Sequence, residues 1–128
     1  MIFKLFAISL QAAMIANLTK KRDIIKKYIF IDGILQKFIG LMFSKKRNIA
    51  LIFRFNKEKI ISLHMLFVFY PIDVLFLGKN RIVVDKKENF RPLAFYSSKK
   101  KSMYAIELPN GAVKKTNTEI GDKIGFWR

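Results

Sequence analysis

The chain has 128 residues, of which 52% are hydrophobic and 14% aromatic, so it can bury one core but is short for two domains. Lysine and arginine number 25 against 9 acidic residues, a formal charge of +16 that points either to an anionic partner or to a solvated basic surface. With no cysteine and a single histidine, disulfide frameworks, thiolate sites and the common zinc sites are excluded.

The N-terminal segment is apolar from Leu5 to Ala16 and follows one early cation, Lys4. It is too short to cross a bilayer alone, and its likeness to a signal peptide is weak. We therefore expect a cytoplasmic protein without a transmembrane span, the alternative being export or membrane association through residues 1–16. The longer apolar run 60–77 contains Pro71 and Asp73, which favours two buried strands over a membrane helix.

In the first half of the chain, the pattern predicts a strand over 23–31, ending near Asp32. Asp32 is a suitable cap for a short amphipathic helix over 34–42, where apolar residues recur at three- and four-residue spacing. A basic loop over 44–48 then leads into a strand over 49–55, where apolar side chains alternate and one face is expected in the core.

In the second half, short segments separated by turns predict a series of strands. We expect strands over 60–70, 72–77 and 81–87, the last two joined by a tight turn at 78–80, and shorter strands over 92–96, 103–108 and 123–127. A helical turn over 112–117 follows the turn signal at 109–111. This order predicts a mainly β (α+β) fold, a compact antiparallel β sandwich or barrel with two short helices.

Four separated motifs resemble the domain of unknown function 192 family in its archaeal-type form. They are Gly40-Leu41-Met42-Phe43, His64-Met65 leading into 71–77, Glu107-Leu108-Pro109-Asn110-Gly111, and Gly121-Asp122-Lys123-Ile124. The resemblance covers about residues 14–127 and implies a small mainly β domain found alone, without an assigned activity. It also implies one domain over 14–128, with 1–13 either an N-terminal extension or the product of a wrongly assigned start, because Met14 resembles the start of shorter members.

Three residues are candidates for ligand binding. Asp73 lies on the strand face of Leu75 and Leu77, where a carboxylate needs a partner; it is either a ligand or acid-base group, or a structural acceptor of backbone hydrogen bonds, which we favour. His64 alone titrates near neutrality, and a core or rim position is its alternative. Glu107 precedes a Pro-Asn-Gly turn, whose geometry it would also serve.

Two basic loops are candidates for anion binding. Lys45, Lys46 and Arg47 form the first, and Lys99, Lys100 and Lys101 form the second; both lie near aromatic residues, as phosphate contact with base stacking requires. Solvated charge runs beside core aromatics explain the same pattern, and we favour that alternative.

Three functions are compatible with these observations. The first, which we prefer by elimination, is a non-catalytic binding domain for a small polar ligand or peptide near His64, Asp73 and Glu107. The second is a nucleic-acid-associated protein that uses the two basic loops. The third is a metal-independent hydrolase that uses Asp73 with His64. No catalytic or metal residues, cofactor motif, nucleophile elbow or phosphate-binding loop are predicted, which makes enzymatic activity the minority hypothesis.

Overall fold

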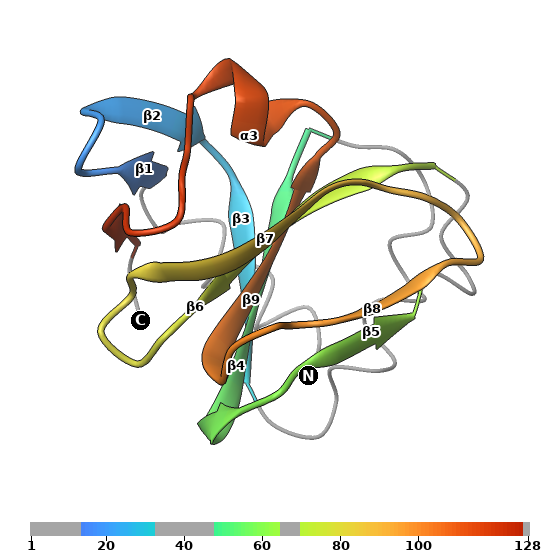
Figure 1. Ribbon diagram of the computed structural model, residues 1–128. Helices are drawn as coiled ribbons and strands as arrows, with labels where there is room; N and C mark the ends of the chain where they lie inside the picture. Colours follow the sequence, from blue (N-terminus) through green and yellow to red (C-terminus); the bar gives the residue numbers. More distant parts are fainter. Residues whose placement is uncertain (1–13, 33–47, 65–69, 127–128) are drawn as a thin grey trace, which may run out of the picture.

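The structure is a computed structural model that describes residues 14–32, 48–64 and 70–126 (Figure 1). Its strands are β1 (Ile15–Asn17), β2 (Arg22–Ile25), β3 (Tyr28–Asp32), β4 (Ala50–Lys59), β5 (Ser62–His64), β6 (Ile72–Leu77), β7 (Val83–Phe90), β8 (Phe95–Ser97), β9 (Ser102–Pro109) and β10 (Ile124–Gly125). One short helix, α3 (Ala112–Lys115), lies in the described ranges. These elements are mainly β, as the sequence predicts.

The central feature is a five-stranded sheet in the order β3-β4-β9-β6-β7, with β9 in the middle. Neighbouring strands run antiparallel except β3 and β4, which are parallel. Apolar residues alternate along its inner strands, so each face of the sheet carries its own core. The position of a residue along β6 or β9 therefore decides which core it joins.

The first core lies between one face of this sheet, the three-stranded sheet β10-β1-β2 and α3. It includes Leu75 and Leu77 of β6, Ile106 and Leu108 of β9, and Val113 of α3. All five side chains are at most 2% exposed, so this face is closed by packing.

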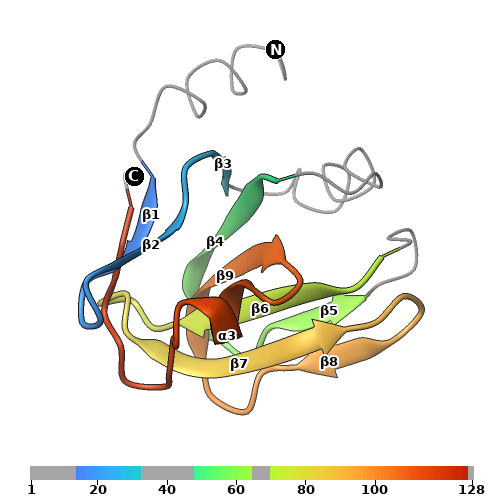
Figure 2. The same cartoon turned by 90° about the horizontal axis from the view of Figure 1, so that it is seen from above.

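The second core lies on the opposite face, toward the β5–β8 pair. Val74 and Phe76 of β6, Leu51 and Phe53 of β4, and Ala105 of β9 belong to it, with Leu63 and Tyr96 packed against it. In Figures 1 and 2 the β10-β1-β2 sheet and the β5–β8 pair lie on opposite sides of the molecule. The central sheet thus separates two apolar cores.

Several sequence predictions are confirmed by the strands. β6 covers the predicted 72–77, the predicted turn at 78–80 joins β6 to β7 in an antiparallel hairpin, and α3 falls within the predicted helical turn. The predicted strand 23–31 is divided at Lys26 and Lys27 into β2 and β3, which belong to different sheets. The expectation of antiparallel pairing fails for β3 and β4. The predicted helix over 34–42 and most of the loop over 44–48 lie outside the described residues.

Candidate functional site

Glu107 lies near the end of the central strand β9. Its neighbours across the sheet are Leu51 of β4 and Val74 of β6, both apolar and both in the second core. Alternation along β9 puts Glu107 on the face of Ala105, opposite to Ile106 and Leu108. The residue is half-buried, and no hydrogen bond or ion pair joins its carboxyl to the described part of the chain.

The electrostatics of this position follow from its apolar surroundings. Burial raises the pKa of Glu107 to about 7, because the ionised form loses water and gains no compensating donor. Near neutral pH the carboxyl is therefore poised between its acid and its carboxylate forms. Such a group can accept a hydrogen bond from a ligand, form an ion pair with a cationic ligand, or exchange a proton with a ligand.

Asp73 lies next to Glu107 in the sheet but on the other face, because Asp73 stands opposite Leu108 while Val74 stands opposite Glu107. Its side chain is 1% exposed. One carboxylate oxygen, Oδ1, accepts a hydrogen bond from the backbone N–H of Asn89 at 3.0 Å. The other, Oδ2, accepts from the N–H groups of Gly111 and Val113, each at 3.0 Å.

These contacts make Asp73 a structural carboxylate. It ties β6 to β7 and supplies acceptors for backbone donors at the start of α3, where Gly111 has no side chain to cap the helix. Gly111 itself adopts φ 91°, a conformation that suits glycine. The structure thus does not bring Asp73 and Glu107 together in one site.

His64 ends β5, where it pairs with Phe95 of β8. Its side chain lies outside the described residues. A ligand contact by His64 accordingly stays a prediction.

The second basic loop is the turn between β8 and β9, and the side chains of Lys99, Lys100 and Lys101 are exposed there. Its backbone is held from two sides. The N–H of Lys99 donates to Oδ2 of Asp85 at 2.8 Å, and the carbonyl of Lys100 accepts from the hydroxyls of Ser98 at 2.9 Å and Ser102 at 3.0 Å. The first basic loop, Lys45, Lys46 and Arg47, lies outside the described residues.

Asp85 also binds a tyrosine. The hydroxyl of Tyr96 donates to Oδ2 of Asp85 at 2.7 Å, which links β8 to β7. Burial, together with the hydrogen bond to this carboxylate and its negative charge, raises the pKa of Tyr96 to about 12. The phenol therefore stays protonated as a donor throughout the neutral range.

A buried polar network around Asn17 was not predicted from the sequence. The Asn17 amide, 0% exposed, donates to Oγ1 of Thr118 at 3.0 Å and to Oδ2 of Asp122 at 2.9 Å, and its oxygen accepts from the N–H of Lys20. Asp122 Oδ2 also accepts from the Lys20 ammonium at 2.8 Å and from the N–H of Glu119 at 2.9 Å. This network fastens β1 to the segment before β10.

The pKa values in this network follow its contacts. Burial alone would raise the pKa of Asp122, but hydrogen bonds from Asn17, Lys20 and the Glu119 N–H, with the charge of Lys20, lower it. The same contact with Asp122, and a second with Glu119, raises the pKa of Lys20. The only sequence signal was Asn17 standing in an apolar segment, 15–18, which alone does not name a partner.

Among the residues that the structure describes, no group of three or more His, Cys, Asp and Glu side chains is placed to hold a metal ion. Within the same ranges, no helix has the length and apolar character needed to cross a membrane.

The sequence model of the DUF192 family, whose description reads "Uncharacterized ACR", matches residues 19–126. The chain belongs to the DUF192 family. Two archaeal UPF0127 proteins are similar to it: that of Pyrococcus furiosus is 38% identical over 114 residues, which cover 88% of this chain and 97% of the relative. That of Thermococcus sibiricus is 39% identical over 115 residues, which cover 88% of this chain and 74% of the relative.

Two crystal structures share the DUF192 fold seen here. A putative transcription regulator from Sinorhizobium meliloti superposes with a TM-score of 0.77 at 21% identity, covering 90% of this chain and 92% of that one. A protein of unknown function from Novosphingobium aromaticivorans gives a TM-score of 0.75 at 18% identity, covering 91% of this chain and 84% of that one. At these identities the likeness concerns the fold alone.

Two of the DUF192 motifs identified in the sequence meet in the central sheet, where β9 ends beside the start of β6. The motif over 71–77 forms β6, and the motif over 107–111 forms the end of β9 and the turn before α3. Asp73 of the first motif binds the N–H of Gly111 in the second. The motif over 121–124 supplies Asp122 to the Asn17 network. The first motif, 40–43, lies outside the described residues.

Proposed function

We propose that this DUF192 protein is a non-catalytic binding domain that takes a small polar ligand at Glu107, on the second-core face of the central sheet. One observation carries the proposal. Glu107 is a carboxyl with apolar neighbours on both adjoining strands and no hydrogen-bond partner in the described residues. Polar groups with apolar surroundings are nearly always hydrogen-bonded in folded proteins, and the half-buried carboxyl of Glu107 is accessible to a partner from outside.

The chemistry of Glu107 selects the ligand class. An ionised carboxyl only accepts hydrogen bonds, so the matching ligand carries an N–H or O–H donor, best an amine. Leu51 and Val74, which flank Glu107 in the sheet, favour a ligand whose remaining atoms are apolar. A short alkylamine or primary amide has both properties, whereas an alkyl carboxylate of the same size has no donor while it is ionised.

The non-catalytic assignment rests on the positions of the acidic groups. A pair of carboxyls for acid-base chemistry must face one substrate, whereas Asp73 and Glu107 stand on opposite faces of the sheet. Asp73 already uses both oxygens for backbone donors. We therefore assign Asp73 to holding β7 and α3, and Glu107 to the ligand.

A titration with small probes tests the proposal. Amide resonances of the ¹⁵N-labelled protein are followed at neutral pH while n-butylamine, butyramide or butyrate is added. We expect saturable shifts with the amine and the amide that centre on Leu51, Val74 and Glu107, and none with butyrate. The amine should bind more tightly than the amide because its ion pair adds to the hydrogen bond.

Two variants that remove the same charge complete the experiment. Glu107→Gln keeps the size of the side chain but should abolish the preference for the amine over the amide. Glu88→Gln, at an exposed position of β7 where the carboxylate pairs with Lys86 at 3.5 Å, should behave as the parent does. An amine response that is absent in the parent, or a preference for the amine over the amide that persists in Glu107→Gln, would overturn the proposal.

A further inference from the structure

Three segments that are distant in the sequence meet at one end of the central sheet. They are the end of β4, the turn between β6 and β7, and the turn between β8 and β9, all found at the lower left of Figure 1. Together they carry six exposed lysines, which we call the lysine end: Lys57, Lys59, Lys79, Lys99, Lys100 and Lys101. Of these six lysines, only Lys99, Lys100 and Lys101 were identified as candidates from the sequence.

Pairing and hydrogen bonds, rather than chance proximity, join these segments. Lys59 stands opposite Ser102, so the end of β4 lies beside the end of the turn that carries Lys101. Glu58 Oε2 accepts a hydrogen bond from the backbone N–H of Lys79 at 2.8 Å, which fastens the β6–β7 turn to β4. A Cβ atom on Gly78 would lie 3.0 Å from that same oxygen, so a larger residue there would displace the Glu58 carboxylate.

The β8–β9 turn is equally well fixed. Ser98 is buried, its N–H donates to the carbonyl of Ile61 at 2.8 Å, and its Oγ accepts from the N–H of Ile61 at 3.0 Å. With the contacts of Lys99 and Lys100 described above, the backbone of the turn has partners on both sides. The three lysine side chains thus project from an ordered support, which limits the entropy lost when they bind.

The charges of the lysine end are not neutralised within the described residues. None of the six ammonium groups forms an ion pair there, although Lys59 lies 4.7 Å from the centre of the Phe55 ring. Two carboxylates contact these segments, and each accepts from a backbone N–H instead: Glu58 from Lys79 and Asp85 from Lys99. Lys20, by contrast, is paired with both Glu119 and Asp122.

We propose that the lysine end binds the phosphate backbone of a nucleic acid. A small anion contacts one or two ammonium groups, whereas a chain of phosphates can contact cations on all three segments and release a counterion at each contact. This surface is separate from Glu107, and the proposal is independent of the function proposed for that residue. It predicts affinity through phosphates with little preference for base sequence.

Fluorescence polarisation with the full chain tests the proposal. The probes are a labelled duplex DNA and a labelled single-stranded RNA, each of about 20 nucleotides per strand, at about 50 and about 200 mM KCl; contact with six phosphates of the duplex predicts a loss of affinity of about a thousandfold between these salts. Replacing Lys99, Lys100 and Lys101 together by Gln should weaken binding at the lower salt by about tenfold or more and reduce the salt slope by about 3.

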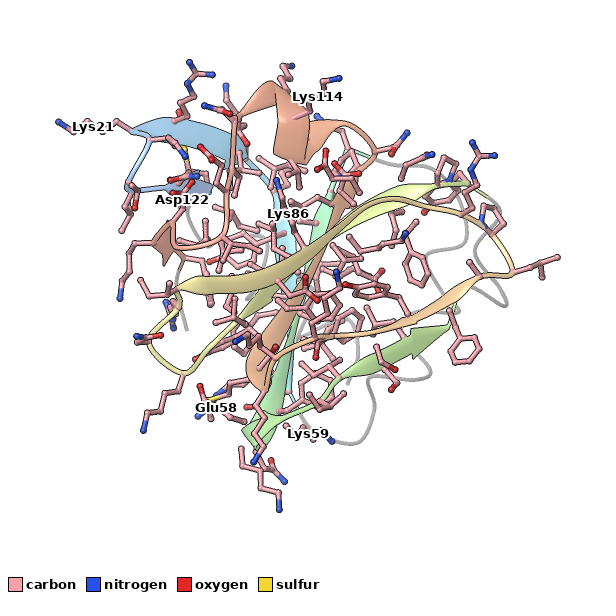
Figure 3. The ribbon with its side chains drawn as sticks, in the orientation of Figure 1. Lys21, Glu58, Lys59, Lys86, Lys114 and Asp122 are labelled. Carbon is pink, nitrogen blue, oxygen red and sulfur yellow. The ribbon has the colours of Figure 1, made fainter. Side chains whose placement is uncertain are left out.

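A matched triple variant separates a local surface from net charge. Lys21, Lys114 and Lys115 are exposed and their replacement by Gln removes the same charge; Figure 3 shows Lys21 and Lys114 at the opposite end from Lys59. This control should keep most of the parent's affinity. Equal losses in both triple variants, or no binding at the lower salt, would overturn the proposal. So would tighter binding to phosphatidylglycerol vesicles than to both nucleic acids, because that result would assign the surface to a membrane.

Discussion

Replacing Asp73 by Asn tests the structural role assigned to this carboxylate. The three backbone donors approach from two directions, Asn89 toward Oδ1, and Gly111 and Val113 toward Oδ2. An asparagine oxygen can serve only one direction, and its NH₂ group then faces a donor. The best arrangement keeps the two bonds near α3, weakened by the loss of charge, and gives up the bond to β7.

The magnitude follows from these contacts. A hydrogen bond to a charged group contributes about 1.5–3 kcal/mol, so one lost bond and two weakened bonds predict a loss of about 3–4 kcal/mol in the free energy of unfolding. With a denaturant slope of about 1.5 kcal/mol/M, the midpoint of urea unfolding should fall by about 2 M. Circular dichroism at neutral pH measures that midpoint.

Asp32→Asn is the control for this measurement. Asp32 is exposed and pairs with Arg54 at 3.2 Å, and exposed ion pairs contribute about 0–1 kcal/mol, so its midpoint should move little. If Asp73→Asn lowers the midpoint no more than Asp32→Asn does, Asp73 does not support β7 and α3, and its availability to a ligand would need to be reconsidered.

Three other predictions follow from the described contacts. Burial raises the pKa of Glu107 from 4.5 to about 7, so the folded state holds this proton more tightly than the unfolded state does, and the free energy of unfolding should fall by up to about 3 kcal/mol as pH rises through this interval. Glu107→Gln should flatten that part of the curve of stability against pH. If urea unfolding gives parallel curves for the parent and the variant, the pKa assigned to Glu107 is contradicted. Asn17→Ala removes three hydrogen bonds of a buried amide and should lower the free energy of unfolding by about 2–4 kcal/mol, whereas a loss below about 1 kcal/mol would show that the network contributes little. Tyr96→Phe should lower the free energy of unfolding by about 1–2 kcal/mol and should remove from the absorbance titration a phenol with a pKa of about 12. If the titration curves of the parent and the variant coincide around pH 12, the hydrogen bond from Tyr96 to Asp85 is contradicted.

Local patterns were sufficient to predict much of the fold. Alternation over 72–77 between turn residues identified β6, because a buried strand with short turns leaves a clear signal. The division of 23–31 into β2 and β3 left no such signal, since both halves have strand-forming residues and the choice of sheet depends on distant partners. The parallel pairing of β3 with β4 is likewise a property of the whole sheet.

The sequence analysis expected Asp73 and Glu107 near one ligand, whereas the structure places them on opposite faces of the central sheet. Asp73 and Glu107 were both identified from their positions among apolar residues and turns. Their placement on opposite faces depends on the register between β6 and β9. A shift of one residue in this pairing would turn the side chains of β6 to the other face and put Asp73 on the same face as Glu107. The Asn17 network joins residues about 100 positions apart, and the lysine end joins two turns and the end of one strand, so neither has a local pattern in the sequence.

The most direct test of the central claim is a titration of the Glu107 side chain itself. In protein labelled with ¹³C at the glutamate carboxyl, the Glu107 resonance is followed from about pH 3 to about pH 9, with and without saturating n-butylamine. The account predicts a midpoint at about 7 in the free protein and a lower midpoint with the amine, because the ammonium ion stabilises the carboxylate. A free midpoint near the ordinary value of 4.5, or a midpoint that the amine leaves unchanged, would contradict it.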